Sequence, residues 1–132
     1  MNETPIRLGI VDDHPAIAEA VAGAARRATE RAMGDGRRPI EVIATARTVA
    51  EGLRLFEPGG GVPDVVLCDV QLESGADGLR VLDAAVAAGA RVIVLTGFDR
   101  AAFARAAFDR GAVGFLSKGA DVDEIVEAVR TV

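Results

Sequence analysis

The chain has 132 residues, of which half are hydrophobic and 27% are charged. This length is that of one ordinary domain, so we expect a single domain over residues 1–132 rather than a multidomain enzyme or a repeat array. The formal net charge of −5 argues against a surface built mainly to bind nucleic acid phosphates.

Short β-branched runs alternate with longer Ala-rich segments along the chain, which is typical of strand-helix units around a parallel sheet. Most of the runs are almost continuously apolar, as expected of strands covered by helices on both faces. The pattern predicts an α/β fold, a flavodoxin-like (βα)5 doubly wound parallel sheet with strand order 2-1-3-4-5. The expected strands are residues 6–11, 40–45, 65–68, 92–95 and 114–116, and the expected helices are residues 15–33, 49–56, 78–88, 100–110 and 122–130.

Several residue types mark where helices begin. Pro15 suits a first helical position, Thr48 with Glu51 has the spacing of a capping box, and Asp121 with Glu124 has the same spacing. Residues 33–39 and 58–63 are rich in glycine and lie between the periodic segments, so we expect surface loops there. Neither loop has the lysine and hydroxyl residue of a phosphate-binding P-loop.

Polar residues end four of the five expected strands. In an open α/β sheet, ligands bind outside the carboxyl ends of the strands, so these side chains are expected to share one pocket. Three neighbouring carboxylates need a compensating cation, and oxygen ligands in a water-accessible site suit Mg²⁺. Lys118 supplies a positive charge for a carboxylate or a phosphoryl group, and Asp69 is the best-placed nucleophile. The strand-end residues are Asp12, Asp13, Asp69, Thr96, Ser117 and Lys118.

The same residues, in this order, resemble the receiver domain of two-component response regulators, and the resemblance covers nearly the whole chain. Val11-Asp12-Asp13-His14-Pro15 and the segment from Gly114 to Asp121 are most similar to receivers of regulators that have a LuxR-type helix-turn-helix output domain.

The resemblance implies a role for each matching position. Asp69 would accept a phosphoryl group from a histidine kinase. Asp12, Asp13, Asp69 and the backbone carbonyl of Gln71 would bind Mg²⁺. Thr96 and Lys118 would contact the phosphoryl group, and Phe115 would be an aromatic switch.

The resemblance also implies an output surface, formed by the fourth helix, the fifth strand and the fifth helix. The fourth helix has Phe103 and Phe108 among alanines, and the fifth has an apolar stripe that is expected to be mostly core: Val122, Ile125, Val126 and Val129. The expected output is control of a DNA-binding domain beyond Val132, with homodimer formation on phosphorylation and no direct nucleic acid contact by residues 1–132. The alternative is a stand-alone regulator that acts through protein contacts.

The sequence departs from the family pattern at three places. Many receivers have proline four residues and glycine eight residues after the phosphoacceptor, whereas Glu73 and Asp77 stand there with Gly78 one later, which predicts an inserted residue in that loop. Gly119 replaces the proline that commonly follows the lysine, so we expect a trans peptide after Lys118. Gly97 follows Thr96 and should leave access to a phosphoryl group.

Two other classes of protein share parts of this pattern. A hydrolase of the haloacid-dehalogenase kind needs a second aspartate two positions after its nucleophile as general acid, and Gln71 stands at that position. A flavin-binding module needs an aromatic side chain to stack on the cofactor, and the chain has no Trp or Tyr. A signalling switch that catalyses only its own phosphorylation and dephosphorylation is therefore favoured over an enzyme with an external substrate.

The remaining histidine, cysteine and arginine residues are expected to have structural roles. His14, which is the only histidine, precedes Pro15 and is interpreted as a helix-start residue rather than a phosphorelay or metal site. The single cysteine, Cys68, cannot form an internal disulfide and is expected to fill space in a buried strand. The arginine cluster is interpreted as a solvated helix end: Arg26, Arg27, Arg31, Arg37 and Arg38. Because the sequence shows no secretory signal and no run of ~18 apolar residues, we expect a cytoplasmic protein without a membrane span.

Overall fold

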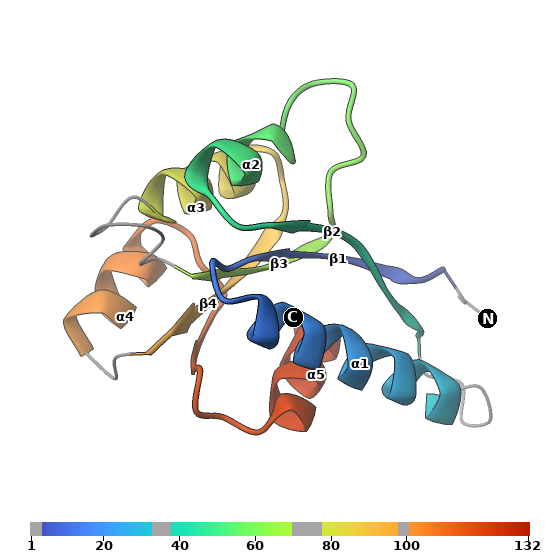
Figure 1. Cartoon of the computed structure of the whole chain (residues 1–132). Helices are drawn as coiled ribbons and strands as arrows, with labels where there is room; N and C mark the ends of the chain where they lie inside the picture. The colour runs from blue at the N-terminus through green and yellow to red at the C-terminus, as the bar shows by residue number, and fades with distance from the viewer. Residues whose placement is uncertain (1–3, 33–37, 70–77, 98–100) are drawn as a thin grey trace.

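The computed structural model describes residues 4–32, 38–69, 78–97 and 101–132. Five parallel strands form one sheet in the order β2-β1-β3-β4-β5, which confirms the predicted fold and strand order (Figure 1). The strands are β1 (Ile6–Val11), β2 (Ile40–Ala46), β3 (Val65–Asp69), β4 (Arg91–Thr96) and β5 (Gly114–Ser117). The helices are α1 (Pro15–Ala32), α2 (Val49–Arg54), α3 (Gly78–Ala87), α4 (Ala101–Asp109) and α5 (Val122–Thr131).

Nine of the ten elements have bounds that differ from the prediction, mostly by one residue, and two of these differences have identifiable reasons. Helix α2 stops at Arg54 because Leu55 and Phe56 donate tighter bonds to the carbonyls of Gly52 and Leu53, just before Pro58. Strand β3 continues through Asp69, which pairs with Leu95 of β4. Asp69 is therefore the last residue of a buried strand and not part of the following loop.

Helices cover both faces of the sheet, as the apolar strands predicted. Helices α1 and α5 pack on one face, and α2, α3 and α4 pack on the other (Figure 1). Successive strand residues serve opposite faces, so Leu67 packs with α1 and α5 while Cys68 packs with the other three helices. The expected burial of Cys68 is confirmed. Three members of the α5 stripe are buried, and Val122 is partly buried.

The two predicted helix caps are present with modified partners. Thr48 caps α2 by accepting a hydrogen bond from the Glu51 amide at 3.1 Å, but the Glu51 carboxylate accepts its return bond from Arg47, one residue before the cap. Asp121 caps α5 through the amide of Asp123 at 2.9 Å. Thr48 and Asp121 precede the helices that follow β2 and β5. These caps therefore set the last residue of two loops at the carboxyl edge of the sheet.

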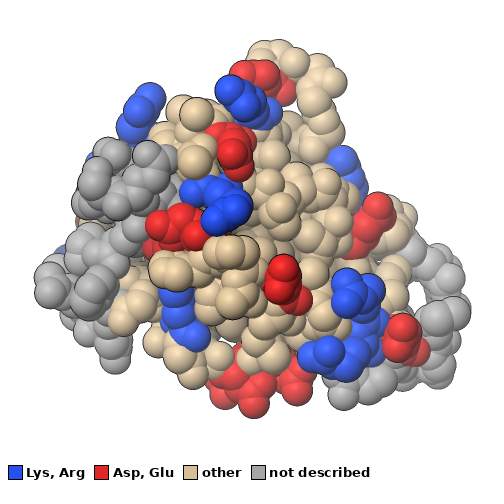
Figure 2. Space-filling model, viewed as in Figure 1, with Lys and Arg blue, Asp and Glu red and all other residues tan. Residues whose placement is uncertain are grey.

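Charged side chains are interspersed on the molecular surface. Figure 2 shows acidic and basic groups alternating over the face in view, with one group of basic side chains at the lower right. Arg26 and Arg27 are exposed, as the prediction of a solvated helix end required, and Arg38 is exposed while bonding the Thr4 carbonyl at 2.9 Å. Arg31 and Arg37 lie outside the residues whose side chains are described. None of the described helices has the length and apolar character needed to cross a bilayer.

Candidate functional site

The carboxyl ends of four adjacent strands bring the polar residues together. Asp12 directly follows β1, Asp69 ends β3, Thr96 ends β4, and Lys118 directly follows β5. Backbone bonds fix two of these positions: the Asp12 amide donates to the Ala46 carbonyl at 2.9 Å, and the Lys118 amide donates to the Thr96 carbonyl at 2.8 Å. The sheet therefore places the residues rigidly, because each one continues a hydrogen-bonded strand.

Burial sets this group apart from ordinary surface charges. Asp12, Asp69 and Thr96 are the buried polar residues among those described, with exposed fractions of 1%, 2% and 0%. Transfer of a carboxylate from water to such a site is costly unless a positive charge or hydrogen-bond donors compensate. A fold that buries two aspartates side by side thus requires a cation at this position.

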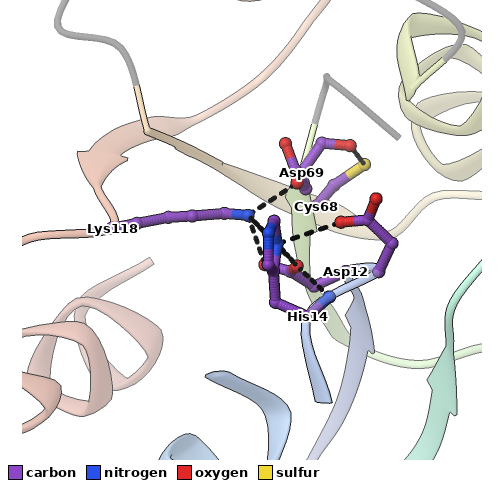
Figure 3. A network of polar contacts seen from close by, with 6 residues as sticks. Asp12, His14, Cys68, Asp69 and Lys118 are labelled. Atoms are coloured by element: carbon purple, nitrogen blue, oxygen red, sulfur yellow. Dashed lines mark hydrogen bonds and ion pairs between the residues drawn. The ribbon is translucent and has the colours of Figure 1, made fainter. Parts of the chain in front are cut away.

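The Lys118 ammonium supplies part of that compensation. Its Nζ atom lies 2.7 Å from Asp69 Oδ2 and 3.1 Å from Asp12 Oδ1, and the lysine side chain is only 14% exposed (Figure 3). Burial lowers the pKa of Lys118, but its hydrogen bonds to Asp69 and Asp12 and their negative charge outweigh that effect and raise the pKa above its ordinary value. Lys118 is therefore firmly protonated at neutral pH.

The negative charges of this site also affect the pKa of Cys68 inside the sheet. Burial is the main cause that raises the pKa of its thiol to about 12, and the charges of Asp69 and Asp12 add to it. The thiol is buried and remains neutral at physiological pH, so it behaves as an apolar filler and not as a nucleophile.

His14 belongs to this site, which the sequence interpretation missed. Its Nδ1 atom lies 3.0 Å from Asp12 Oδ1, 3.0 Å from Asp13 Oδ1 and 3.0 Å from Lys118 Nζ. The backbone explains the placement, because the His14 amide donates to Asp12 Oδ1 at 2.8 Å and so turns the chain over the carboxylate before α1. The signal in the sequence is its position next to Asp13, although the helix-start interpretation of His14 was preferred there to a metal site.

The donor set fits a divalent cation. Asp12, Asp13, His14 and Asp69 each offer one ligand atom, and these four atoms all lie within 4.8 Å of one another. Two buried carboxylate oxygens, Asp12 Oδ2 and Asp13 Oδ1, accept no hydrogen bond from the described residues; Lys118 Nζ lies 3.0 Å from the first without hydrogen-bond geometry. Three carboxylates and one ammonium have a net charge of about −2, which one Mg²⁺ would neutralise.

Other predicted site residues occupy the surroundings or lie outside the described residues. Phe115, opposite Val94 in the sheet, is partly buried against the α2, α3 and α4 side of the core. The peptide after Lys118 is trans, as expected from Gly119. A Cβ atom placed on Gly97 would meet none of the described residues within 4 Å, so they leave the approach beside Thr96 open. Gln71, Glu73 and Asp77, and with them the predicted inserted residue, lie outside the described residues, as does the side chain of Phe103.

The sequence matches the family described as response regulator receiver domain over residues 8–130. Among curated relatives, the transcriptional regulatory protein LnrK of Bacillus subtilis is 32% identical over 96% of the chain and 53% of its own length. The nitrate/nitrite response regulator protein NarP of Escherichia coli is 34% identical over 96% of the chain and 54% of its own length. The chain thus spans about half the length of the curated relatives it matches.

Solved structures give the same result. The signal receiver domain of the response regulator NarL from Mycobacterium tuberculosis superposes with a TM-score of 0.78 at 31% identity, covering 95% of this chain and 93% of that one. A LuxR-family response regulator from Aurantimonas gives 0.74 at 30% identity, over 97% and 84%. A Burkholderia pseudomallei response regulator with a phosphorylated aspartic acid and a calcium ion gives 0.74 at 25% identity, over 95% and 66%.

Proposed function

The chain belongs to the response regulator receiver domain family, and from this premise we propose that residues 1–132 form one receiver domain whose phosphoacceptor is Asp69. The observation that carries the proposal is the position of Asp69. Its carboxylate ends the central strand β3, lies 2.7 Å from the Lys118 ammonium, and belongs to the cluster with Asp12 and Asp13. Receiver domains are signalling switches of two-component systems, and the relatives include receivers of LuxR-family regulators.

The proposed reaction is an in-line phosphoryl transfer. A carboxylate oxygen of Asp69 attacks the phosphorus of the donor, a new oxygen–phosphorus bond forms, and the bond to the leaving group on the opposite side breaks with its electron pair. The protein's part is to hold the nucleophile rigidly and to offer positive charge to the phosphoryl oxygens. Lys118 already contacts the nucleophile, and its long side chain allows the ammonium to follow the charge onto a phosphoryl oxygen.

Asp12, Asp13 and Asp69, with the backbone carbonyl of Gln71, are proposed to hold Mg²⁺ at this site. The bound ion supplies positive charge that offsets the repulsion between the aspartates and the incoming phosphoryl oxygens. The buried carboxylate oxygens that lack hydrogen bonds support this assignment. Turnover of an external substrate is not part of the proposal, since Gln71 stands where a hydrolase of this kind needs its general acid.

Thr96 and Phe115 are proposed to transmit the phosphorylated state. Thr96 is fully buried at the end of β4, one residue beyond Leu95, the partner of Asp69, and its hydroxyl is proposed to bond a phosphoryl group there. A shift of Thr96 toward that group would let Phe115 turn inward and change the surface formed by α4, β5 and α5. Phe108 and Val113, 49% and 48% exposed, are large apolar residues on or next to this surface. Contacts made only in the phosphorylated state bias such a two-state equilibrium.

The partners follow from the family. We propose that a histidine kinase donates the phosphoryl group in the cytoplasm, that phosphorylation promotes homodimer formation, and that the output is a DNA-binding transcription regulator domain encoded after Val132. Residues 1–132 would not contact nucleic acid themselves. Sequencing the gene beyond the Val132 codon distinguishes this arrangement from a stand-alone regulator, because only the former encodes a helix-turn-helix there.

The phosphoacceptor is tested with a small phosphodonor such as acetyl phosphate and Mg²⁺. Intact mass spectrometry should show one added phosphoryl group on the wild type and none on Asp69→Asn. Gly97→Ala is the matched control, because its new methyl group meets none of the described residues, and it should label like the wild type. Equal labelling of Asp69→Asn would move the acceptor elsewhere.

A further inference from the structure

His14 presents an electrostatic conflict that no protonation state of its ring resolves. The Nδ1 atom faces two carboxylate oxygens and one ammonium nitrogen, each at 3.0 Å. With a proton, Nδ1 donates to a carboxylate but points a positive group at Lys118. Without one, Nδ1 accepts from Lys118, and this electron-rich atom then lies 3.0 Å from the negative oxygens of Asp12 and Asp13. One partner is always mismatched.

A divalent cation beside Nδ1, with the Lys118 ammonium kept on Asp69, removes the conflict. Its charge attracts the two carboxylate oxygens and the nitrogen lone pair together, so every group in contact is matched. The spacing agrees with this reading, because two ligand atoms at right angles, each about 2.1 Å from a metal ion, are about 3.0 Å apart. Nδ1 lies at that separation from Asp12 Oδ1 and from Asp13 Oδ1.

We propose that His14 is a direct nitrogen ligand of the metal ion in this receiver, joining the carboxylates of Asp12, Asp13 and Asp69. The proposal rests on the metal site of the proposed function and adds a residue to it. Two observations support it: one ligand atom from each of the four residues lies within 4.8 Å of the others, and Nδ1 faces two carboxylate oxygens and an ammonium at once. The hydrogen bond that the His14 backbone amide donates to Asp12 Oδ1 holds the ring over the cluster before any ion arrives.

A nitrogen ligand changes which ions the site prefers. Mg²⁺ favours an all-oxygen shell, whereas imidazole suits later first-row metals such as Ni²⁺, whose affinities also rise along that row. His14 thus acts as a specificity-determining residue for the metal. We expect His14→Asn to lower Ni²⁺ affinity about tenfold or more and to change Mg²⁺ affinity by less than about threefold, because asparagine leaves an oxygen donor near the place of Nδ1.

Pulsed electron paramagnetic resonance of bound Mn²⁺ gives a readout that is independent of phosphorylation. His14 is the only histidine in the sequence, so in tag-free protein any imidazole nitrogen coupling to the ion has one source. The wild type should show this coupling and His14→Asn should lose it while still binding Mn²⁺. Asp13→Ala serves as the control that Mn²⁺ occupies the acidic cluster, since its binding should fall sharply.

Each outcome decides a different part of the account. Bound Mn²⁺ without imidazole coupling, or coupling that persists in His14→Asn, overturns the role of His14 and leaves the metal site of the proposed function intact. Failure of the wild type to bind Mn²⁺ overturns both. Equal Ni²⁺ affinities for the wild type and His14→Asn also contradict the inference.

Discussion

Replacement of Lys118 by methionine should destabilise the protein strongly when divalent cations are absent. The substitution keeps most of the side chain's volume but removes an ammonium that lies 2.7 Å from Asp69 and 3.0 Å from Asp12, whose side chains are 3% and 0% exposed. Removal of one partner from a buried ion pair costs about 3–5 kcal/mol, because the remaining charge stays buried. We expect about 3 kcal/mol, the lower end, because the cluster opens to water where the His14 ring is 64% exposed.

Urea denaturation in EDTA measures this loss. With an unfolding slope of about 2 kcal/mol/M, the midpoint should fall by about 1.5 M. Adding Asp12→Asn to Lys118→Met should recover part of the loss, because it removes one of the uncompensated charges. Millimolar Mg²⁺ should stabilise Lys118→Met more than the wild type. Unchanged stability of Lys118→Met in EDTA, or no recovery from Asp12→Asn, would refute the view that Lys118 balances the buried carboxylates.

The pH dependence of the stability difference between the wild type and Lys118→Met tests the direction in which the pKa of Lys118 is shifted. The folded-state pKa of Lys118 lies above its ordinary value of 10.5, so its stabilising contribution is complete below the unfolded pKa and is lost as pH rises through the folded pKa. The stability difference between the wild type and Lys118→Met should therefore persist through neutral pH and shrink only above that value. A difference that shrinks on going from pH 7 to pH 9 would contradict the ion-pair assignment.

Two further predictions concern the packing beneath and beside the site. In the folded chain the pKa of Cys68 is raised from 9.0 to about 12. At pH 8 the folded chain should therefore have about a thousandfold less Cys68 thiolate than the chain unfolded in urea, so a thiol reagent should label Cys68 only on unfolding. Rapid labelling of the native protein would show that β3 is accessible. Gly52→Val should destabilise the fold by about 1–3 kcal/mol, because a Cβ at Gly52 already meets Val81 at 3.1 Å and Val11 at 3.3 Å. Gly97→Ala, whose methyl group meets open space, should change the stability by less than about 0.5 kcal/mol; equal losses in both would rule out close packing of α2 as the cause.

The elements of the fold were predictable because their signals are local and strong. The apolar runs of β1, β3 and β4 have no alternating polar face, which indicates strands covered on both sides, and Thr48 and Asp121 mark helix starts with capping chemistry. The end of α2 was misjudged by two residues, because the tighter turn at Leu55 and Phe56 depends on backbone bonding that composition does not reveal.

The site was predictable wherever strand topology alone determines position. Asp12, Asp69, Thr96 and Lys118 converge because the order 2-1-3-4-5 brings four strand ends to one edge. The position of the His14 ring was not predictable by that route, since it depends on a backbone hydrogen bond to the Asp12 carboxylate and on the reach of the lysine from β5. A one-dimensional pattern shows that His14 adjoins Asp13, but not that its ring faces Lys118.

The central claim is that the carboxylate of Asp69 receives the phosphoryl group, and chemical mapping tests it most directly. Borohydride reduces an aspartyl phosphate to homoserine, so treatment of protein phosphorylated by acetyl phosphate and Mg²⁺, followed by peptide sequencing by mass spectrometry, marks the acceptor without any substitution. The account predicts homoserine at position 69 only. Homoserine at position 12 or 13, or phosphate recovered on His14, would contradict it.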